Sequence, residues 1–325
     1  MTGTMKAIVM RAPGPPDSLK LEEMPIPEPA PGKVLIRVRA RGINRSEMFT
    51  RQGHSPGLQY PRVLGIEACG EVVAAPSGEF APGDVVASIM GGMGRLWDGG
   101  YAEYCLVPAT QIQKITVKLD WATLGAMPEM LQTAHGSLFR SLQLKAGEVL
   151  LVRGGTTSVG LSAAALARNA GAKVISTSRS ANRVDLLKAN GASETIVDSG
   201  SIAAEVRMLY PNGVDKVLEL IGTVTLQDSL RCTREGGIVC MTGIVGDSWT
   251  LNDLNPMDFI PTGVCLTSYA DPNAFMKIPM NELAQQVADK TLNITIGRTL
   301  SLEEIPLAHE LMESNKAGGK IVVLS

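Results

Sequence analysis

At about 150 residues per domain, the 325-residue chain predicts two domains, and its 45% hydrophobic and 19% charged residues exclude a disordered chain or a coiled coil. The 30 basic and 32 acidic residues give a net charge of −2, and aromatic residues are only 4%, so nucleic acid is not expected as a partner. No apolar run reaches the roughly 20 residues of a membrane span, which predicts a cytoplasmic protein with no membrane partner.

Residues 1–120 have the pattern of a β-rich region. The run VLIRVRARGI (34–43) alternates apolar and charged positions, the period of a strand with one buried face. Further strand candidates are ACGEVVAA (68–75), DVVAS (84–88) and YAEYCLVP (101–108). Many short strands joined by glycine and proline turns predict a small barrel-like domain.

From residue 123 onward the pattern changes to alternating strands and helices. EVLLVRG (148–154) is a continuous apolar run, as expected of a parallel strand buried on both faces, and a helix of small residues follows at 159–171. The remaining predicted strands are 173–178, 195–198, 215–222, 236–243 and 264–269, with helices at 181–190, 202–209 and 225–233. Six strands with helical crossovers predict a doubly wound parallel sheet. The tail adds one helix and a terminal strand, IVVLS, that can return to the first domain.

The turn between the first parallel strand and its helix is the predicted phosphate site. It reads Arg-Gly-Gly-Thr-Thr-Ser-Val-Gly over 153–160, where free N–H groups and the helix dipole both face an anion. Glycines allow the tight turn, hydroxyl groups can donate hydrogen bonds, and Ser158 suits the helix N-cap. Cofactor contacts are expected from Gly154, Gly155, Thr156, Thr157, Ser158, Val159 and Gly160. An ordinary βα turn without a ligand is the alternative.

The end of the second parallel strand decides between the two nicotinamide cofactors. A site for NAD usually has an acid there, which bonds the ribose 2′-hydroxyl. This chain has Ser178-Arg179-Ser180, then Arg183, and no acid until Asp185. An arginine can bind a 2′-phosphate with paired N–H donors, so the sequence favours NADP(H), with Ser178, Arg179 and Arg183 as contacts. Solvated arginines on a loop are the alternative.

Cysteines and histidines give no sign of a metal site. The five cysteines are scattered and contain no Cys-x-x-Cys pair, and the three histidines are far apart. A structural zinc needs four closely grouped ligands, and no segment offers even three. We therefore expect reduced thiols and no metal.

Several segments together resemble the medium-chain dehydrogenase/reductase superfamily, in its zinc-free quinone oxidoreductase (zeta-crystallin-like) branch. The matching order runs through MKAIVM (5–10), YPRVLGIEACGEVV (60–73), GGYAEYCLVP (99–108), the 153–160 turn and HELMESNKAGGKIVVLS (309–325). The resemblance implies an α/β protein with a Rossmann NADP(H)-binding domain over 123–289. It also implies a β-rich GroES-like catalytic domain built from 1–122 and 290–325.

The departures from the zinc alcohol dehydrogenases indicate the chemistry. Those enzymes have a cysteine where this chain has Asn44, and Gly-His-Glu where it has Gly65-Ile66-Glu67. Without zinc to polarise a carbonyl, reduction of an electron-poor acceptor is the expected reaction. The resemblance implies hydride transfer from NADPH to a quinone or an activated enone. The alternatives are a 2-enoyl-thioester reductase, whose expected tyrosine acid is replaced here by His54 and Ser55 with Tyr60 further on, and an NADPH-binding protein without catalysis.

Further residue roles follow from matching positions in the family. Asn44 would line the nicotinamide end and orient a substrate oxygen. Thr133 would border the cofactor, or cap a helix N-terminus, and Lys320 would reach a phosphate or lie solvated on a turn. Gly222, Gly243 and Ile244 follow strand ends where the dinucleotide runs, and Glu67 is expected to be a structural hydrogen-bond acceptor. The apolar strand at 264–269, at the edge of the sheet, would pair across a two-fold axis in a homodimer.

Overall fold

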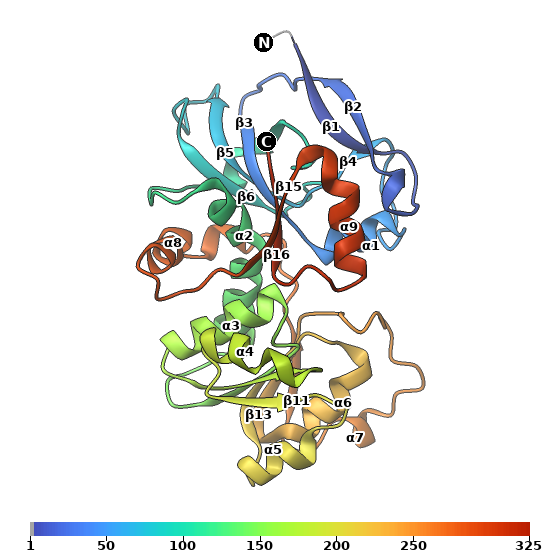
Figure 1. The fold of residues 1–325 in the computed structure, drawn as a ribbon, viewed down its shortest axis with the longest axis vertical. Coiled ribbons are helices and arrows are strands. Elements are labelled where there is room, and N and C mark those ends of the chain that lie inside the picture. The colour runs from blue at the N-terminus through green and yellow to red at the C-terminus, as the bar shows by residue number, and fades with distance from the viewer. Residues whose placement is uncertain (1–2) are drawn as a thin grey trace. The chain divides into compact units, whose positions relative to one another are not determined.

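Three β-sheets organise the part of the chain that the computed structural model describes, residues 3–325 (Figure 1). The chain divides into two compact units, each with its own hydrophobic core. Unit 1 contains the residues up to Glu129, together with Pro272–Asp289 and Ile294–Ser325. Unit 2 contains Met130–Asp271 and Lys290–Asn293. Among residues 3–325, no helix is both long and apolar enough to cross a membrane.

Unit 1 is built around the long strand β3 (Lys33–Ile43). This strand is antiparallel to its three partners, β5 (Glu67–Ala74), β7 (Tyr104–Pro108) and β16 (Lys320–Leu324). The same sheet also contains β6 (Val85–Ile89), β8 (Ile112–Lys114) and β15 (Ile296–Ser301), and a second sheet joins β2 (Lys20–Pro25), β1 (Thr4–Met10) and β4 (Arg62–Val63). The strands predicted in the first 120 residues are thus confirmed, with shifted ends.

The predicted single buried face of β3 is correct only for its middle, residues 36–39. Arg37 is exposed between buried neighbours, but Arg41 is fully buried and donates to the Ala102 carbonyl at 3.1 Å and to the Ser325 hydroxyl at 2.6 Å. From Ala40 to Ile43 every residue of β3 is buried, so the side chains on both faces of this part of the strand are covered. Polar alternation in the sequence does not reveal that burial.

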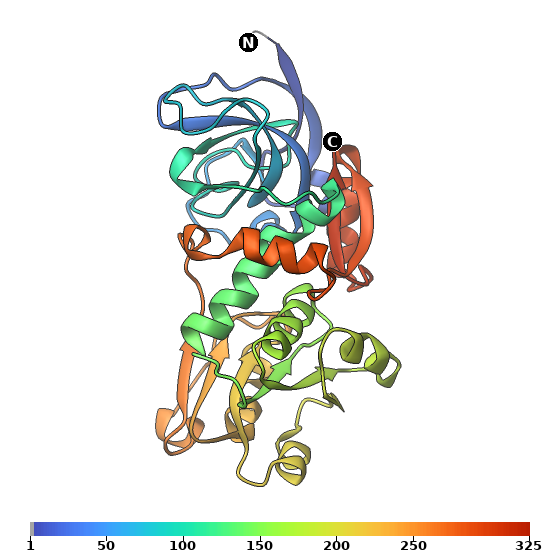
Figure 2. The same ribbon diagram turned by 90° about the vertical axis from the view of Figure 1, so that its left-hand side faces the viewer.

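The C-terminal strand returns to unit 1, as predicted. Strand β16 pairs with β3, with Val322 opposite Gly42 and Ile321 opposite Ile43. Figure 2 shows this C-terminal segment in red, with helix α9 (Ile305–Glu313) packed beside its strands. Strand β15 was not predicted; its polar, half-exposed residues carry no apolar pattern, and it forms because it pairs in parallel with β16.

The predicted domain boundary at residue 289 differs from the division in the structure. Helix α8 (Met280–Ala288) and the segment before it belong to unit 1 rather than to unit 2. Gln113 of unit 1 donates to the carbonyls of Phe275 and Ile278, and Asn281 donates to the Lys114 carbonyl at 2.7 Å. These hydrogen bonds attach the segment around α8 to β8 of unit 1. They join residues far apart in the chain, so the sequence alone does not predict them. Unit 1 also contains α1 (Arg45–Arg51), and α2 (Trp121–His135) spans the boundary at residue 129.

Unit 2 contains the six-stranded parallel sheet that the sequence predicts. Its strands are β9 (Val149–Arg153), β10 (Lys173–Ser178), β11 (Glu194–Val197), β12 (Val214–Glu219), β13 (Thr233–Met241) and β14 (Cys265–Ser268). Their order is β11-β10-β9-β12-β13-β14, and all neighbours are parallel. The strand order reverses between β9 and β12, and ligands of open α/β sheets bind beyond the carboxyl ends at such a point.

Helices cover both faces of this sheet. In Figure 1, α3 (Ser158–Asn169) and α4 (Val184–Ala189) lie on one face, and α5 (Ala203–Leu209) and α6 (Thr223–Cys232) lie on the other. A short helix, α7 (Pro256–Phe259), precedes β14, and a π-helical turn (Gly136–Ser141) follows α2. The helices leave the carboxyl ends of β9, β10 and β12 as the edge on which a site can be built.

Candidate functional site

The turn from β9 to α3 requires glycine at three positions. Gly154 has a φ of +85°, in the left-handed region that favours glycine. A Cβ on Gly155 would lie 3.0 Å from the Thr177 carbonyl oxygen, and one on Gly160 would lie 2.6 Å from the Gly154 carbonyl oxygen. Any side chain at Gly160 would therefore push α3 away from the turn, which explains a glycine two residues inside the helix.

Thr157, and not Ser158, is the N-cap of α3. Its hydroxyl accepts from the Gly160 N–H at 2.9 Å and donates to the Gly154 carbonyl at 2.9 Å, so the predicted cap is wrong by one residue. Ser158 is the first helical residue. Because the Thr157 hydroxyl donates its single hydrogen to Gly154, and its N–H also bonds that carbonyl, Thr157 shapes the turn rather than offering donors to a ligand.

The first N–H groups of α3 remain available to an anion. An α-helix leaves its first four N–H groups without helical partners. In α3 the Gly160 N–H bonds the Thr157 cap, and Ser158 and Val159 come before it in the helix. With the positive end of the helix dipole, these groups suit a phosphate. The structure therefore brings together the features that the turn sequence predicts, with the cap shifted from Ser158 to Thr157.

Strand β10 is joined directly to this turn. Gly154 donates its N–H to the Thr177 hydroxyl at 3.1 Å, and Gly155 donates to the Thr177 carbonyl at 3.0 Å. Ser178, half-buried, ends the strand, and Arg179 beyond it is exposed, as is Arg183 one short turn later. The arginines singled out in the sequence thus follow the strand end that adjoins the phosphate turn.

The turns after β12 and β13 contact each other. Gly222 has a φ of +107°, and a Cβ there would lie 3.2 Å from the Gly243 carbonyl oxygen and 3.3 Å from the Ile244 Cα. A Cβ on Gly243 would lie only 2.4 Å from the Leu220 carbonyl oxygen. The structure therefore brings Gly222, Gly243 and Ile244 together at one edge of unit 2, as the sequence predicts.

Thr133 lies near the end of α2, which rules out N-terminal capping as its role.

Asn44 lies in a buried polar cluster of unit 1. Its amide N–H groups bond the carboxylate of Glu67 at 2.9 Å and that of Glu47 at 3.3 Å, and its oxygen accepts from the Lys320 ammonium at 2.5 Å. Since both N–H groups are used inside the cluster, this geometry does not support the prediction that they orient a substrate oxygen. Glu67 accepts from Asn44, Lys320 and the Glu129 N–H, as expected for a structural acceptor.

Lys320 completes the cluster and does not lie on a solvated turn. Its side chain is 1% exposed, and its ammonium lies 2.9 Å from Glu67 and 3.8 Å from Glu129. Burial alone would lower the pKa of Lys320, but the neighbouring carboxylates outweigh burial and raise it. A cation bound in this way has no free donor for a phosphate, so the predicted phosphate contact of Lys320 is corrected to an internal ion pair.

Glu47 is a further buried carboxylate of the cluster. Its carboxylate accepts from the Ile66 N–H at 3.1 Å, and burial raises its pKa to about 7. Glu47 and Glu129 could not be recognised as members of this cluster from the sequence, because their common partner, Lys320, lies far from both along the chain. The candidate proton donors His54 and Tyr60 are exposed, on the segment that follows α1.

Comparisons with known proteins agree with both units. Residues 30–117 match the family model described as the alcohol dehydrogenase GroES-like domain, and 158–279 match that described as zinc-binding dehydrogenase. The chain is 30% identical to a quinone oxidoreductase of Lama guanicoe, over 98% of this chain and 97% of the relative. It belongs to the medium-chain dehydrogenase/reductase superfamily, in the zeta-crystallin-like quinone oxidoreductase branch. It is therefore an oxidoreductase with a GroES-like domain and a Rossmann sheet.

Two further similarities concern substrate and cofactor. An acryloyl-coenzyme A reductase of Metallosphaera sedula is 25% identical, with 98% of this chain and 99% of the relative covered. A mycobacterial protein solved in complex with NADPH is 27% identical, with a TM-score of 0.87 over 99% of this chain and 100% of the other. Both proteins are thus similar to this oxidoreductase over nearly the whole length of its chain.

The zinc that the family name implies does not fit the residues of this oxidoreductase. Ile66 replaces a histidine ligand and cannot bind a metal, and the Lys320 ammonium occupies the centre of the Asn44 cluster. A bound divalent cation there would be repelled by this buried positive charge. Within residues 3–325, no group of three or more His, Cys, Asp and Glu side chains is arranged to hold a metal.

Proposed function

We propose that this protein is an NADPH-dependent reductase that transfers a hydride to a quinone or an activated enone without zinc. The observation that carries the proposal is the edge of unit 2, where the α3 N-terminus, with its glycine turn, adjoins the strand end followed by Arg179. NADPH, when bound, would supply the hydride, and water or a nearby hydroxyl group would supply the proton that completes reduction.

The residues of this edge have separate roles in holding the cofactor. Gly154, Gly155 and Gly160 let the backbone approach the pyrophosphate, and the N–H groups of Ser158 and Val159 bind it. The hydroxyl groups of Thr156 and Ser158 are further donors at this turn. Ser178, Arg179 and Arg183 bind the 2′-phosphate, because a guanidinium matches a phosphate with paired donors. The rest of the dinucleotide is bordered by Gly222, Gly243, Ile244 and Thr133.

Oxidation of NADPH with a panel of quinones and 2-alkenals tests the proposal. We expect turnover with 1,4-naphthoquinone or a short 2-alkenal at a rate well above the reaction without protein. Inactivity with every acceptor, despite NADPH binding, would favour a binding protein without catalysis.

A 2-enoyl-thioester reductase is the second candidate, and the similarity to an acryloyl-coenzyme A reductase supports it. Comparison of crotonyl-CoA with 1,4-naphthoquinone under the same conditions separates the two. A much higher kcat/KM for the thioester would replace the quinone and enone proposal.

We also propose that the chain forms a homodimer through β14. This strand is the last of the six-stranded sheet, and Leu266 on it is 38% exposed. An exposed apolar edge strand invites pairing with another strand. Sedimentation of the intact chain should give twice the mass of one chain, and Leu266→Lys should shift it towards the monomer.

A further inference from the structure

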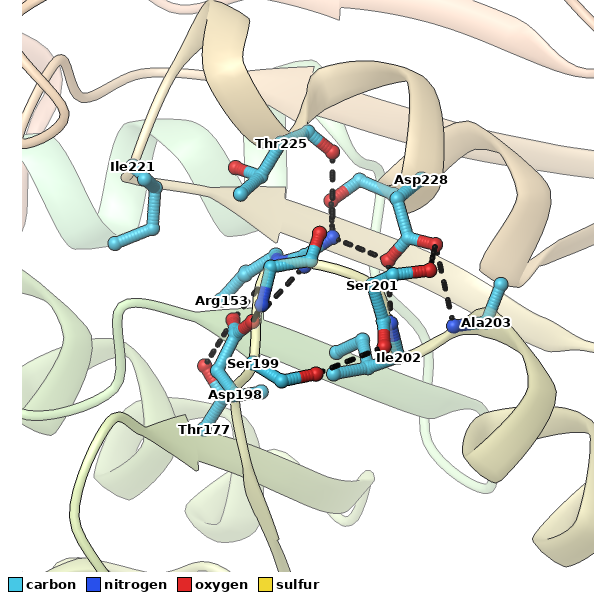
Figure 3. Close-up of polar contacts among 12 residues, drawn as sticks. Arg153, Thr177, Asp198, Ser199, Ser201, Ile202, Ala203, Ile221, Thr225 and Asp228 are labelled. Carbon is cyan, nitrogen blue, oxygen red and sulfur yellow. Dashed lines mark hydrogen bonds and ion pairs between the residues drawn. The ribbon is translucent and has the colours of Figure 1, made fainter.

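Arg153 is a fully buried cation at the end of the first parallel strand. It precedes Gly154 of the phosphate turn, and its guanidinium points toward α6 and the loop after β11 (Figure 3). Nε and Nη2 form a paired interaction with the Asp198 carboxylate at 2.8 and 3.0 Å. Nη2 also donates to the Gly200 carbonyl at 2.9 Å, and Nη1 donates to Asp228 at 2.7 Å. Such a complete set of partners is what a buried guanidinium requires.

Asp198 connects this cation to the strand that carries Arg179. Its backbone N–H donates to the Ser178 carbonyl at 2.8 Å, and its carboxylate accepts from the Thr177 hydroxyl at 3.3 Å. The same Thr177 hydroxyl accepts from the Gly154 N–H. The Asp198 carboxylate therefore lies beside the end of β10, which Arg179 follows, and it is linked through the Thr177 hydroxyl to the phosphate turn.

Asp228 carries the second half of the network. Its carboxylate accepts from the N–H groups of Ile202 at 2.8 Å and Ala203 at 3.3 Å, which fixes the loop after β11 (Figure 3). Ser229, beside it on α6, accepts from Arg153 at 3.2 Å and donates to the buried Glu219. One guanidinium thus contacts the carboxylates of Asp198 and Asp228 directly and is linked to that of Glu219 through Ser229.

The charges at this edge matter for a phosphorylated cofactor. An acid near the ribose repels a 2′-phosphate, which is why such an acid marks sites for the unphosphorylated cofactor. Asp198 is an acid in this neighbourhood, although it follows β11, the third parallel strand in chain order, rather than β10, the second. Its charge is matched by Arg153, and both its oxygens point into that pairing.

We propose that Arg153 is a positioning residue that sets cofactor preference, because it holds Asp198 and neutralises its carboxylate beside the strand end that carries Arg179. The inference rests on the proposed use of NADP(H) by this edge. It assigns to Arg153 a selective effect on the phosphorylated cofactor, separate from its contribution to folding. Removing Asp198 charge and removing Arg153 charge should therefore change the preference in opposite directions.

The decisive comparison is Asp198→Asn against Asp215→Asn. Both substitutions remove one carboxylate paired with an arginine, but Asp215 pairs with Arg234 near the start of β12, at the opposite edge of the same sheet. Dissociation constants for NADPH and NADH are measured by fluorescence titration of each protein. We expect Asp198→Asn to raise the preference for NADPH over NADH by about three- to tenfold, and Asp215→Asn to leave it unchanged.

The Arg153→Met variant tests the opposite change in cofactor preference. It should lower the preference for NADPH by a similar factor, and the double variant Arg153→Met/Asp198→Asn should return it toward the original value even if thermal stability stays low. A purely structural Arg153 would weaken both cofactors equally and leave the ratio unchanged, which overturns the inference. If Arg153→Met does not fold, the Asp198→Asn ratio alone decides. Binding of neither cofactor by the unaltered protein would overturn the proposed function and this inference together.

Discussion

The Lys320 ammonium lies 2.9 Å from the Glu67 carboxylate, and neither side chain is exposed by more than 1%. Asn44 bonds both of them, so one amide, one cation and one carboxylate form a closed set inside unit 1. Gly42 makes this possible, because a Cβ there would lie 2.2 Å from Glu67 and 2.3 Å from Lys320. The position at which zinc relatives hold a metal is therefore filled by the protein's own charges.

Loss of the Lys320 charge should be strongly destabilising. Lys320→Met leaves Glu67 buried without its cation, and breaking a buried pair costs about 3–5 kcal/mol of the free energy of unfolding. Lys6→Met, which breaks an exposed ion pair with Glu303, is the matched control and should change stability little. Urea unfolding measures both. Equal losses for the two variants would show that the Lys320 pair contributes no more than a surface pair.

The cap assignment predicts a difference between two adjacent residues. Thr157→Ala removes the hydroxyl that bonds Gly160 and should cost about 1 kcal/mol of the free energy of unfolding. Ser158→Ala should change it by less than about 0.5 kcal/mol, because Ser158 is not the cap. Denaturant midpoints at constant slope provide the comparison. A larger loss for Ser158→Ala than for Thr157→Ala would indicate that Ser158 is the N-cap, as predicted from the sequence.

Arg179 should discriminate between the two nicotinamide cofactors. Hydrogen bonds to a charged group are worth about 1.5–3 kcal/mol, so Arg179→Ala should weaken NADPH binding by about tenfold to a hundredfold and leave NADH binding unchanged. Arg168→Ala, an exposed arginine at the other end of α3, is the control and should affect neither. Isothermal titration gives both constants. Equal weakening of NADPH and NADH would mean that Arg179 does not contact the 2′-phosphate.

Glu47 should give stability a specific pH dependence. Its pKa is raised from 4.5 to about 7 in the folded protein, so between these values the unfolded state has lost a proton that the folded state keeps. Its contribution to stability therefore falls as pH rises through this window and is constant above it, by on the order of 3 kcal/mol in total. The difference in unfolding free energy between the unaltered protein and Glu47→Gln, taken near pH 5 and near pH 8, isolates this term. A pH-independent difference would contradict a protonated, buried Glu47.

Short-range patterns in the sequence predict most of the fold. The six parallel strands contain short apolar runs, and four of them, β9, β11, β12 and β13, are followed by a glycine within three residues. Both features are local, so the sheet of unit 2 can be predicted almost strand by strand. Strand β15 and the placement of α8 could not be predicted, because they depend on partners elsewhere in the chain rather than on their own periodicity. Local pattern identifies an element but not the unit on which it packs.

The same distinction holds for the candidate site: its contiguous motif could be predicted from the sequence, and its long-range contacts could not. The phosphate turn is a contiguous motif, so its glycines and the arginine at the next strand end could be identified from the sequence. The Asn44–Lys320 contact joins positions 276 residues apart, and the Arg153 contacts reach 45 and 75 residues along the chain. An arginine at the end of a buried apolar strand does signal that acidic partners must exist, but it does not say which ones.

Zinc-free hydride transfer from NADPH is tested by steady-state reduction of 1,4-naphthoquinone in the presence of a metal chelator, with NADPH and NADH as alternative donors. We expect NADPH to be oxidised at the same rate with and without chelator, and the kcat/KM for NADPH to exceed that for NADH by about tenfold or more. Activity that is abolished by the chelator and restored by zinc would contradict a zinc-free reaction, and an equal or greater kcat/KM for NADH would contradict the preference for NADPH.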